Sequence, residues 1–270
     1  MIKLEKSCRF NATDTFECGQ CFRWNCDDNG VYVGISAGKV CCVKDRDIIC
    51  NDEDNEYWSQ YFSLSTDYDA ICSKLNEIDD KISPCIEFGS GIRILKQDVW
   101  ETIVSFIISA NNNIPRIKKI IESMCKMFGD RIEFDDKIYY SFPSAERLAK
   151  IDISELAPLK AGYRDKYIMD AAQKVASGEV DIANLDNLPD DELKKNLMKI
   201  KGVGGKVADC IMLFAFERFS VFPVDVWIKR IITQVYGVED KLIQQYVKEK
   251  YGDIAGFAQQ YLYYYYRSNS

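Results

Sequence analysis

The sequence contains no histidine, and no apolar run in it approaches 18 residues. Eleven cysteines are present, but Cys18 and Cys21 form the only Cys-x-x-Cys pair, and the nearest candidate partners are the adjacent Cys41 and Cys42. Because a zinc site of this kind needs a second well-spaced pair of ligands, we expect none. We interpret the cysteines as buried, reduced thiols. A membrane span needs a longer apolar run, so we expect no membrane association.

A signal peptide is also missing from the start of the chain. Residues 1–5 lack the basic segment followed by an apolar segment that secretion requires, so we expect an intracellular protein, in the cytoplasm and nucleoid or in a eukaryotic nucleus. The 270 residues, 47% hydrophobic and 29% charged, are typical of a globular protein with one large domain or two smaller ones.

Acidic residues outnumber basic ones, which at first argues against a nucleic-acid partner. The formal net charge is −7, but residues 1–90 contain 9 Lys/Arg against 17 Asp/Glu, whereas residues 91–270 contain 26 against 25. DNA responds to charges within a Debye length of about 8 Å. The acidic N-terminal third therefore lowers the expected non-specific affinity without excluding DNA as a partner.

The first fifty residues have the alternation and turn residues of β-strands, and amphipathic helices predominate after residue 90. We therefore expect an α+β fold, with an N-terminal antiparallel β-sheet domain with short helices at residues 1–90 and an all-α domain at residues 91–270. Expected strands are Cys21–Asn25, Val31–Ile35 and Lys39–Val43, and short helices are expected near Asn55–Phe62 and Tyr68–Ile78. Later helices are expected at Asp98–Ala110, from Ile114, near Ser144–Ala149, and at Arg164–Ser177, Asp190–Lys199, Lys206–Phe216, Val226–Tyr236, Lys241–Tyr251 and Gly256–Tyr265.

A glycine-rich turn at residues 200–206 separates two of these expected helices. Gly202, Gly204 and Gly205 allow a tight turn whose backbone N–H groups precede a helix N-terminus, an arrangement that suits a phosphate. The same glycines would also suit a helix-helix corner that needs close packing. The motif alone leaves both interpretations open.

Lys206 opens the second helix of this pair, where the positive end of the helix dipole opposes its charge. This field, with partial burial, is expected to lower the pKa of the ammonium group and release a nucleophilic amine. The alternative is a solvated lysine that touches a phosphate. Asp225 follows 19 residues later and is expected to cap a helix N-terminus. A capped carboxylate is also held rigidly enough to stabilise an oxocarbenium ion.

Segments along almost the whole chain resemble the 8-oxoguanine DNA glycosylase/lyase family of helix-hairpin-helix DNA glycosylases. The hairpin at about 190–217 is similar to this family's version, and no cysteine beyond Cys210 is present to form the iron–sulfur loop of endonuclease III relatives. The matching segments are 19–24, 91–98, 105–107, 111–114 with Arg116, 162–164, 202–210 and 256–263. The resemblance implies a cleft between two helical lobes, duplex DNA containing 8-oxoguanine as the partner, no cofactor and a monomeric chain.

The resemblance also implies roles for individual residues. Lys206 would attack C1′ of a flipped nucleotide, expel the base and form a Schiff base that undergoes β-elimination, while Asp225 would orient and stabilise the sugar. Base-binding residues would be Gly19, Phe106, Cys210, Pro223, Gln259 and Tyr263. DNA-binding residues would be Asn111, Arg116, Tyr163, Arg164, Gly202, Gly204, Gly205 and Trp227.

Four features of the base site follow from the same resemblance. The Gly19 carbonyl would accept from N7–H, which 8-oxoguanine has and guanine lacks. Cys210 lies four residues after Lys206, on the same helix face, and the two would form a thiolate-like dipole against the oxidised base. Gln259 would bind the Watson–Crick edge. Tyr263 would stack on the base where the family often has phenylalanine.

Further expectations concern the DNA backbone and the opposite strand. Asn111 would fill the gap in the duplex and Tyr163 would wedge the opposite strand. Arg116 and Arg164 would contact the orphaned cytosine, so we expect cytosine to be preferred opposite the lesion. Trp227 stands where eukaryotic relatives have histidine, so the phosphate contact of that histidine is lost or taken over by the indole N–H. No metal is required, although the resemblance allows an ion at the backbone of Met198, Ile200 and Val203.

Two other functions are compatible with parts of the pattern. An alkylpurine DNA glycosylase shares the fold and the aspartate but acts without a lysine nucleophile, so Lys206 argues against it. A non-catalytic helix-hairpin-helix DNA-binding module would leave the co-occurrence of Gly19, Asp225 and Gln259 unexplained. We therefore expect a bifunctional DNA glycosylase/AP lyase that removes 8-oxoguanine from duplex DNA.

Overall fold

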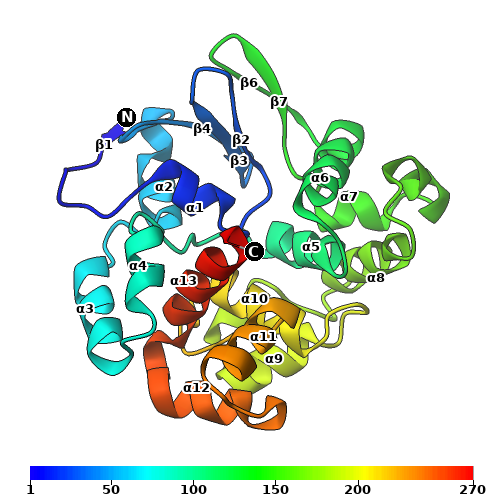
Figure 1. The fold of residues 1–270 in the computed structure, drawn as a ribbon. Coiled ribbons are helices and arrows are strands. Elements are labelled where there is room, and N and C mark those ends of the chain that lie inside the picture. Colours follow the sequence, from blue (N-terminus) through cyan, green and yellow to red (C-terminus); the bar gives the residue numbers. More distant parts are fainter. Residues whose placement is uncertain (270) are drawn as a thin grey trace.

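The computed structural model describes residues 1–269, and its N-terminal part contains a five-stranded antiparallel sheet in the order β1-β5-β4-β3-β2 (Figure 1). The strands are β1 (Ile2–Lys3), β2 (Trp24–Cys26), β3 (Tyr32–Ser36), β4 (Lys39–Lys44) and β5 (Asp47–Ile49). The three strands expected from the sequence are confirmed. The two others escape prediction because segments of two or three residues carry too little alternation to detect.

One face of this sheet is buried because the strand register aligns its apolar side chains. Trp24 of β2 lies opposite Gly34 of β3, which lies opposite Cys41 of β4. The helix α1 (Ala12–Glu17) covers this face, and its Phe16 ring stacks on Trp24 with ring centroids 3.9 Å apart. The remaining aromatic members of this small core are Phe10, Tyr32, Phe62 and, from α2 (Asn55–Tyr61), Trp58 and Tyr61.

A second, larger core unites the helices of the rest of the chain. The short helices α3 (Tyr68–Ile78) and α4 (Ser83–Phe88) contribute to this larger core, through Tyr68 and Leu75 among others. Figure 1 shows both helices beside the C-terminal helices rather than on the sheet. The sheet and the helical part therefore interlock, and the domain boundary near residue 90 stays a prediction.

The long helices form two lobes, with α5 to α8 in one and α9 to α13 in the other (Figure 1). The helix α5 packs on both α8 and α10, so it joins the lobes, while α13 returns toward the N-terminal sheet. The bounds are α5 (Val99–Ser109), α6 (Ile114–Phe128), α7 (Ala145–Ala149), α8 (Arg164–Ala176), α9 (Asp190–Leu197), α10 (Gly205–Phe216), α11 (Val226–Val235), α12 (Ile243–Tyr251) and α13 (Ala255–Ser268). Short 3₁₀ turns are η1 (Asp52–Asp54), η2 (Ile153–Leu159), η3 (Leu185–Asn187), η4 (Asp240–Leu242) and η5 (Gly252–Ile254).

The predicted helices of this part are all found, with ends that move by up to three residues. A short hairpin that the sequence did not predict, β6 (Arg131–Phe134) with β7 (Lys137–Tyr140), interrupts them and approaches β4. Its turn, Asp135 and Asp136, has positive φ at both residues. Within residues 1–269, no helix is long and apolar enough to cross a membrane.

Candidate active site

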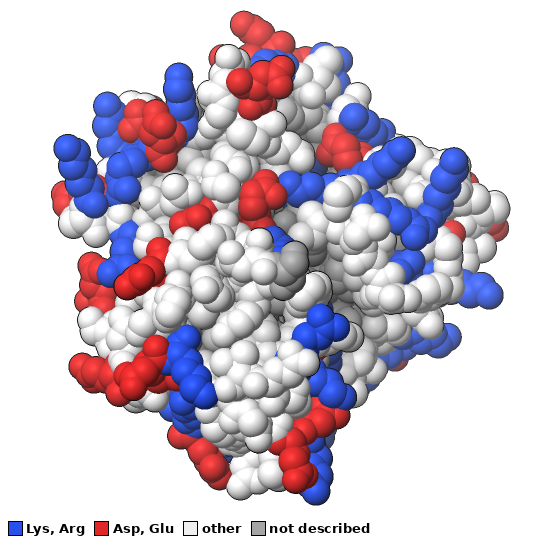
Figure 2. Space-filling view, in the orientation of Figure 1, with Lys and Arg blue, Asp and Glu red and all other residues white. Residues whose placement is uncertain are grey.

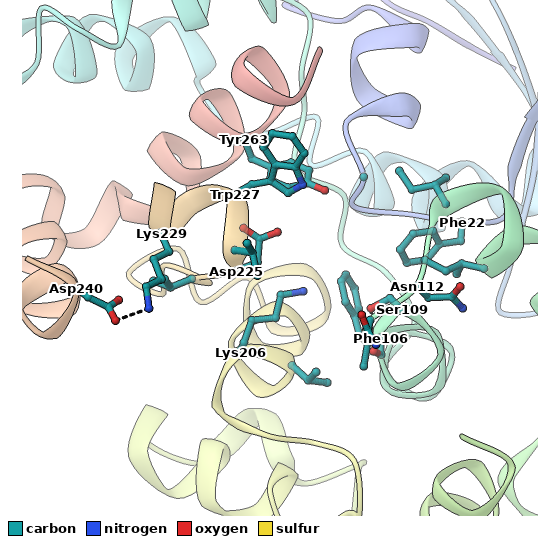
Figure 3. Close-up of a pocket in the computed structure, with 18 residues that line it drawn as sticks. Phe22, Phe106, Ser109, Asn112, Lys206, Asp225, Trp227, Lys229, Asp240 and Tyr263 are labelled. Carbon is teal, nitrogen blue, oxygen red and sulfur yellow. Dashed lines mark hydrogen bonds and ion pairs between the residues drawn. The ribbon is translucent and has the colours of Figure 1, made fainter. Parts of the chain in front are cut away.

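A cavity of about 770 Å³ lies between the two helical lobes, and both predicted catalytic residues, Lys206 and Asp225, line it (Figure 3). Its walls come from α5 and the turn after it, from the first turns of α10 and α11, from α13, and from the N-terminal segment at Gly19 and Phe22. The lining residues are Gly19, Phe22, Phe106, Ser109, Ala110, Asn111, Asn112, Ile114, Ile117, Lys206, Val207, Val224, Asp225, Val226, Trp227, Lys229, Asp240 and Tyr263.

Lys206 lies in the first turn of α10 and extends into this cavity (Figure 3). Its Nζ atom stands 5.6 Å from the centre of the Phe106 ring. Burial lowers the pKa of this ammonium group, but Cys210 and Asp225 raise it, and the pKa ends above the ordinary lysine value. The predicted lowering of the pKa is therefore wrong for the DNA-free protein, because the two neighbours outweigh burial.

Cys210 lies one turn further along α10 and is buried against Lys206. Burial raises the pKa of this thiol, although Lys206 opposes the shift. Burial of the thiol thus opposes the predicted thiolate-like dipole, while the neighbouring Lys206 favours it, and the dipole stays a prediction. Phe106, on the facing α5, stacks on Phe214 with ring centroids 5.5 Å apart and so completes this apolar wall.

Asp225 caps the N-terminus of α11, as predicted, because its Oδ1 atom accepts the Ile228 N–H at 2.8 Å. The cap fixes the side-chain torsions, and the carboxylate lies in the same cavity as Lys206 (Figure 3). A lysine and a rigid carboxylate thus share one cavity although they start different helices.

Gly19 and Tyr263 form the wall next to the N-terminal segment. Gly19 has φ +87°, a conformation that side chains other than glycine rarely adopt. A Cβ there would lie 2.9 Å from Arg267 Nη1 and 3.0 Å from Tyr263 Cε1. Glycine is therefore required by both the backbone conformation and the close approach of α13.

Three of the predicted base-binding residues, Cys210, Pro223 and Gln259, do not line the cavity. Pro223 is buried in the segment before Asp225. Gln259 is 6% exposed, and within residues 1–269 its Oε1 atom has no hydrogen-bond partner. The amide is therefore a buried acceptor close to α13's cavity face, and its role in base binding stays a prediction.

The turn after α5 presents Asn111 to the cavity in a left-handed conformation, with φ +50°. Arg164 holds this turn, since its guanidinium donates to the Ala110 carbonyl at 3.1 Å and to the Asn111 carbonyl at 2.9 Å. With 3% of its surface exposed, Arg164 supports the turn and does not project toward solvent. Tyr163, by contrast, is 52% exposed.

Arg116 is the exposed arginine near this turn. It donates one hydrogen bond, from Nη2 to the Lys160 carbonyl at 3.0 Å. Its remaining donors are available to a ligand, so of the two arginines expected at the orphaned base, Arg116 is the one placed at the surface.

The hairpin between α9 and α10 separates its glycines into two roles. Gly202 has φ +88° and lies so close to Tyr167 that a Cβ would be 2.6 Å from that ring. Gly204 and Gly205 have open space on their Cβ sides, as a backbone site for a phosphate requires. Close packing thus explains Gly202, while phosphate binding at Gly204 and Gly205 stays a prediction.

The carbonyls expected to hold an ion lie at this hairpin. The Ile200 carbonyl accepts the Val203 N–H at 3.1 Å, and Lys174 Nζ donates to the neighbouring Lys199 carbonyl at 2.6 Å. An ammonium group therefore already lies beside the turn, and an ion there stays a prediction. Within residues 1–269, no group of three or more acidic or cysteine side chains is arranged to hold a metal.

Several cavity residues were not singled out in the sequence. Phe22 lies in the matched segment 19–24 and could have been identified from it. Lys229 and Asp240 form an ion pair at the cavity edge, and their sequences contain no local signal because only the tertiary fold brings them together. Trp227 lines the same edge, and the Arg230 guanidinium lies 5.3 Å from its ring centre.

The charge distribution on this side of the molecule is uneven. Figure 2 shows Lys and Arg side chains over the lobe of α6 to α8 and beside the central hollow, with acidic side chains gathered mainly at the periphery. A phosphate backbone laid across the hollow would therefore meet basic groups despite the net charge of −7.

Comparison with known proteins agrees with this geometry. Residues 1–103 match the family described as 8-oxoguanine DNA glycosylase, N-terminal domain, and residues 104–253 match the HhH-GPD superfamily of base excision DNA repair proteins. The N-glycosylase/DNA lyase of Saccharomyces cerevisiae is 32% identical over 264 residues, covering 83% of this chain and 68% of the yeast protein.

Two solved structures are similar over nearly the whole chain. The Clostridium acetobutylicum 8-oxoguanine glycosylase/lyase, in complex with duplex DNA containing cytosine opposite 8-oxoguanine, is 42% identical with a TM-score of 0.91, over 97% of this chain and 93% of that one. MBOgg1 in complex with a low-affinity DNA ligand is 46% identical with a TM-score of 0.93, over the same shares. The chain therefore belongs to the 8-oxoguanine DNA glycosylase family, within the HhH-GPD superfamily of base excision DNA repair proteins, and is a DNA glycosylase with lyase activity.

Proposed function

We propose that this protein excises 8-oxoguanine from duplex DNA, prefers cytosine in the opposite strand, and cleaves the damaged strand by β-elimination. The observation that carries the proposal is the convergence of Lys206 and the capped Asp225 on one cavity of about 770 Å³. That volume is typical of a ligand site and suits a flipped nucleotide. The DNA complexes of the relatives support the substrate class.

The chemistry begins with proton removal, because Lys206 is an ammonium in the DNA-free protein. Asp225 is a carboxylate that shares its cavity and is the proposed proton acceptor. The amine then bonds to C1′ as the C1′–N9 bond breaks, the bonding electrons leave with the base, and the proton held by Asp225 passes to the departing base. This transfer restores the Asp225 carboxylate, which stabilises the positive charge that develops at C1′ and O4′.

Strand cleavage follows from the covalent intermediate. Sugar ring opening leaves a Schiff base between Lys206 and C1′, whose electron withdrawal acidifies the C2′ protons. Loss of one C2′ proton breaks the C3′–O bond and releases the 3′ strand with its 5′ phosphate. Hydrolysis of the Schiff base restores Lys206 as the free amine and leaves an unsaturated aldehyde on the other strand end.

Recognition of the lesion and of the opposite base uses separate walls. The Gly19 carbonyl is the proposed acceptor for N7–H, with Cys210 and Tyr263 on either side of the base plane. Arg116 supplies donors for the O2 and N3 acceptors of cytosine, while Asn111 occupies the space that the flipped nucleotide leaves. Adenine offers Arg116 a poorer match, which supports the preference for cytosine.

The test is nicking of an 8-oxoguanine:C duplex, with borohydride added to trap the Schiff base. Wild type should nick the strand and become covalently linked to it. Lys206→Gln should lose the adduct and at least about 10⁴-fold in nicking, because the proposed nucleophilic amine is removed. An 8-oxoguanine:A duplex should be cut more slowly. Wild-type excision without any trapped adduct would overturn the lysine mechanism and favour an alkylpurine-type glycosylase.

A further inference from the structure

The segment that carries Gly19 is held by one face of α13. Gln260 Nε2 donates to the Cys18 carbonyl at 2.8 Å, and Arg267 Nη2 donates to the Glu17 carbonyl. Tyr263 lies between these two on the helix and packs its ring against Gly19. Positions 260, 263 and 267 share a helix face, so a single rigid element fixes three consecutive residues of the turn.

The other side of the same turn is fixed as well. Gln20 is fully buried, and its Nε2 atom donates to the Arg93 carbonyl at 2.8 Å while its Oε1 atom accepts the Leu95 N–H at 2.9 Å. The Gly19 carbonyl is therefore flanked by two anchored residues. On the cavity side, the position of Gly19 is set by its contact with α13.

Arg267 makes the contact closest to Gly19. Its guanidinium centre lies 5.3 Å from the Tyr263 ring centre, and its Nη1 atom would be 2.9 Å from a Cβ on Gly19. This Nη1 atom is buried and has no hydrogen-bond partner within residues 1–269. A buried donor without a partner is unfavourable, so the position of this atom beside the turn needs an explanation.

We propose that Arg267 is a positioning residue that sets the discrimination between 8-oxoguanine and guanine, by preventing the Gly19 turn and the Tyr263 ring from moving apart. This inference rests on the proposed function of the cavity. The proposed positioning role depends on the contact between Arg267 and Tyr263 and does not involve the reacting atoms. Arg267 acts through two cavity residues and is itself absent from the lining.

The physical reason lies in the chemistry of N7. In 8-oxoguanine N7 carries a hydrogen and donates to a carbonyl, whereas in guanine N7 is a lone pair that a carbonyl repels. Repulsion rejects guanine only if the carbonyl cannot move away from it. A loosened turn would still bind 8-oxoguanine but would also tolerate guanine, so discrimination falls more than affinity for the lesion.

The experiment measures binding in a Lys206→Gln background, where no base is excised. Dissociation constants for 8-oxoguanine:C and G:C duplexes are compared at one salt concentration. Arg267→Gln should lower the ratio of these constants about tenfold, equivalent to about 1.4 kcal/mol. Arg267→Lys keeps one donor and the charge and should lower the ratio about threefold. Arg131→Gln, at an exposed arginine of β6, removes the same charge and should leave the ratio unchanged.

The ratio separates positioning from general destabilisation, because a partly unfolded protein loses affinity for both duplexes equally. If Arg267→Gln does not fold, Arg267→Lys decides the question by the same ratio. Folded variants with an unchanged ratio would overturn the role of Arg267 alone. If the background protein with Arg267 intact fails to prefer 8-oxoguanine, the proposed function is refuted, and this inference with it.

Discussion

The two rims of the cavity are built in different ways. On the rim of α10 and α11, Lys206 and Asp225 each occupy the first residues of a helix, and the nearest backbone holds them, as in the Asp225 cap. On the opposite rim, Asn111 is placed by a side chain 53 residues away, through the hydrogen bond from Arg164 to its carbonyl. Local contacts thus position the groups proposed to react, and a long-range contact positions Asn111, the residue proposed to enter the duplex.

This difference has a consequence for how each rim responds to mutation. A helix cap persists as long as its helix forms, so the catalytic rim tolerates exchange of charge without loss of structure. A left-handed turn at a residue other than glycine costs roughly 1–3 kcal/mol and persists only when its surroundings hold it. The rim that carries Asn111, here called the duplex-facing rim, should therefore lose its geometry when the Arg164 side chain is removed.

The sharpest test of the catalytic rim is Asp225→Asn. The amide oxygen can still accept the Ile228 N–H, so the free energy of unfolding should change by less than about 0.5 kcal/mol. The carboxylate charge is lost, and single-turnover excision should fall about 10²–10³-fold. Urea unfolding and excision rates measured on the same preparations provide both numbers.

Asp98→Asn is the matched control for this substitution. Asp98 caps α5 in the same manner, accepting the Glu101 N–H at 2.8 Å, and it does not line the cavity. Its excision rate should match wild type. Equal losses of activity in both variants would mean that the Asp225 charge has no special role. The conclusion that the α10 and α11 rim carries the catalytic groups would then fail.

The same contrast explains what could be predicted from the sequence. Lys206 and Asp225 were predictable because the signals that position them are local in the sequence. The glycine turn directly precedes Lys206, and Asp225 directly precedes the helix that it caps. Burial of Arg164 was not, since its acceptors Ala110 and Asn111 lie in another segment. The direction of the Lys206 pKa shift was also missed, because it depends on how Cys210 and Asp225 together outweigh burial in the folded chain.

The opposite rim is tested by Arg164→Met, which keeps the aliphatic stem and removes every guanidinium donor. The carbonyls of Ala110 and Asn111 lose these charged donors, so the free energy of unfolding should fall by about 2–3 kcal/mol. Nicking of 8-oxoguanine:C should fall about tenfold, and borohydride trapping of an abasic duplex, which needs less base flipping, should fall less.

Arg116→Met is the informative comparison, because Arg116 is exposed and makes one hydrogen bond. Its unfolding free energy should stay within about 0.5 kcal/mol of wild type, while the preference for cytosine over adenine narrows. If both arginine variants are equally stable, Arg164 does not support the turn in solution.

The remaining test concerns Glu101, in the first turn of α5, whose side chain is 12% exposed. Burial raises the pKa of this carboxyl to about 7, against the opposing charge of Arg23 at 3.7 Å. Since the folded pKa exceeds the unfolded one, the folded state binds the proton more tightly. Stability is therefore highest at acidic pH and declines as pH rises from about 4.5 to about 7.

Glu101→Gln removes this titration, so the free energy of the variant relative to wild type should rise by on the order of 2 kcal/mol between pH 5 and pH 8. Urea unfolding at both pH values measures it. The loss of the Arg23 partner adds an offset that does not depend on pH in this range. If the difference in unfolding free energy between the variant and wild type is the same at pH 5 and pH 8, the Glu101 carboxylate is in contact with water. The stability of the protein would then depend no more on the buried groups of α5 than on the helix cap at Asp225.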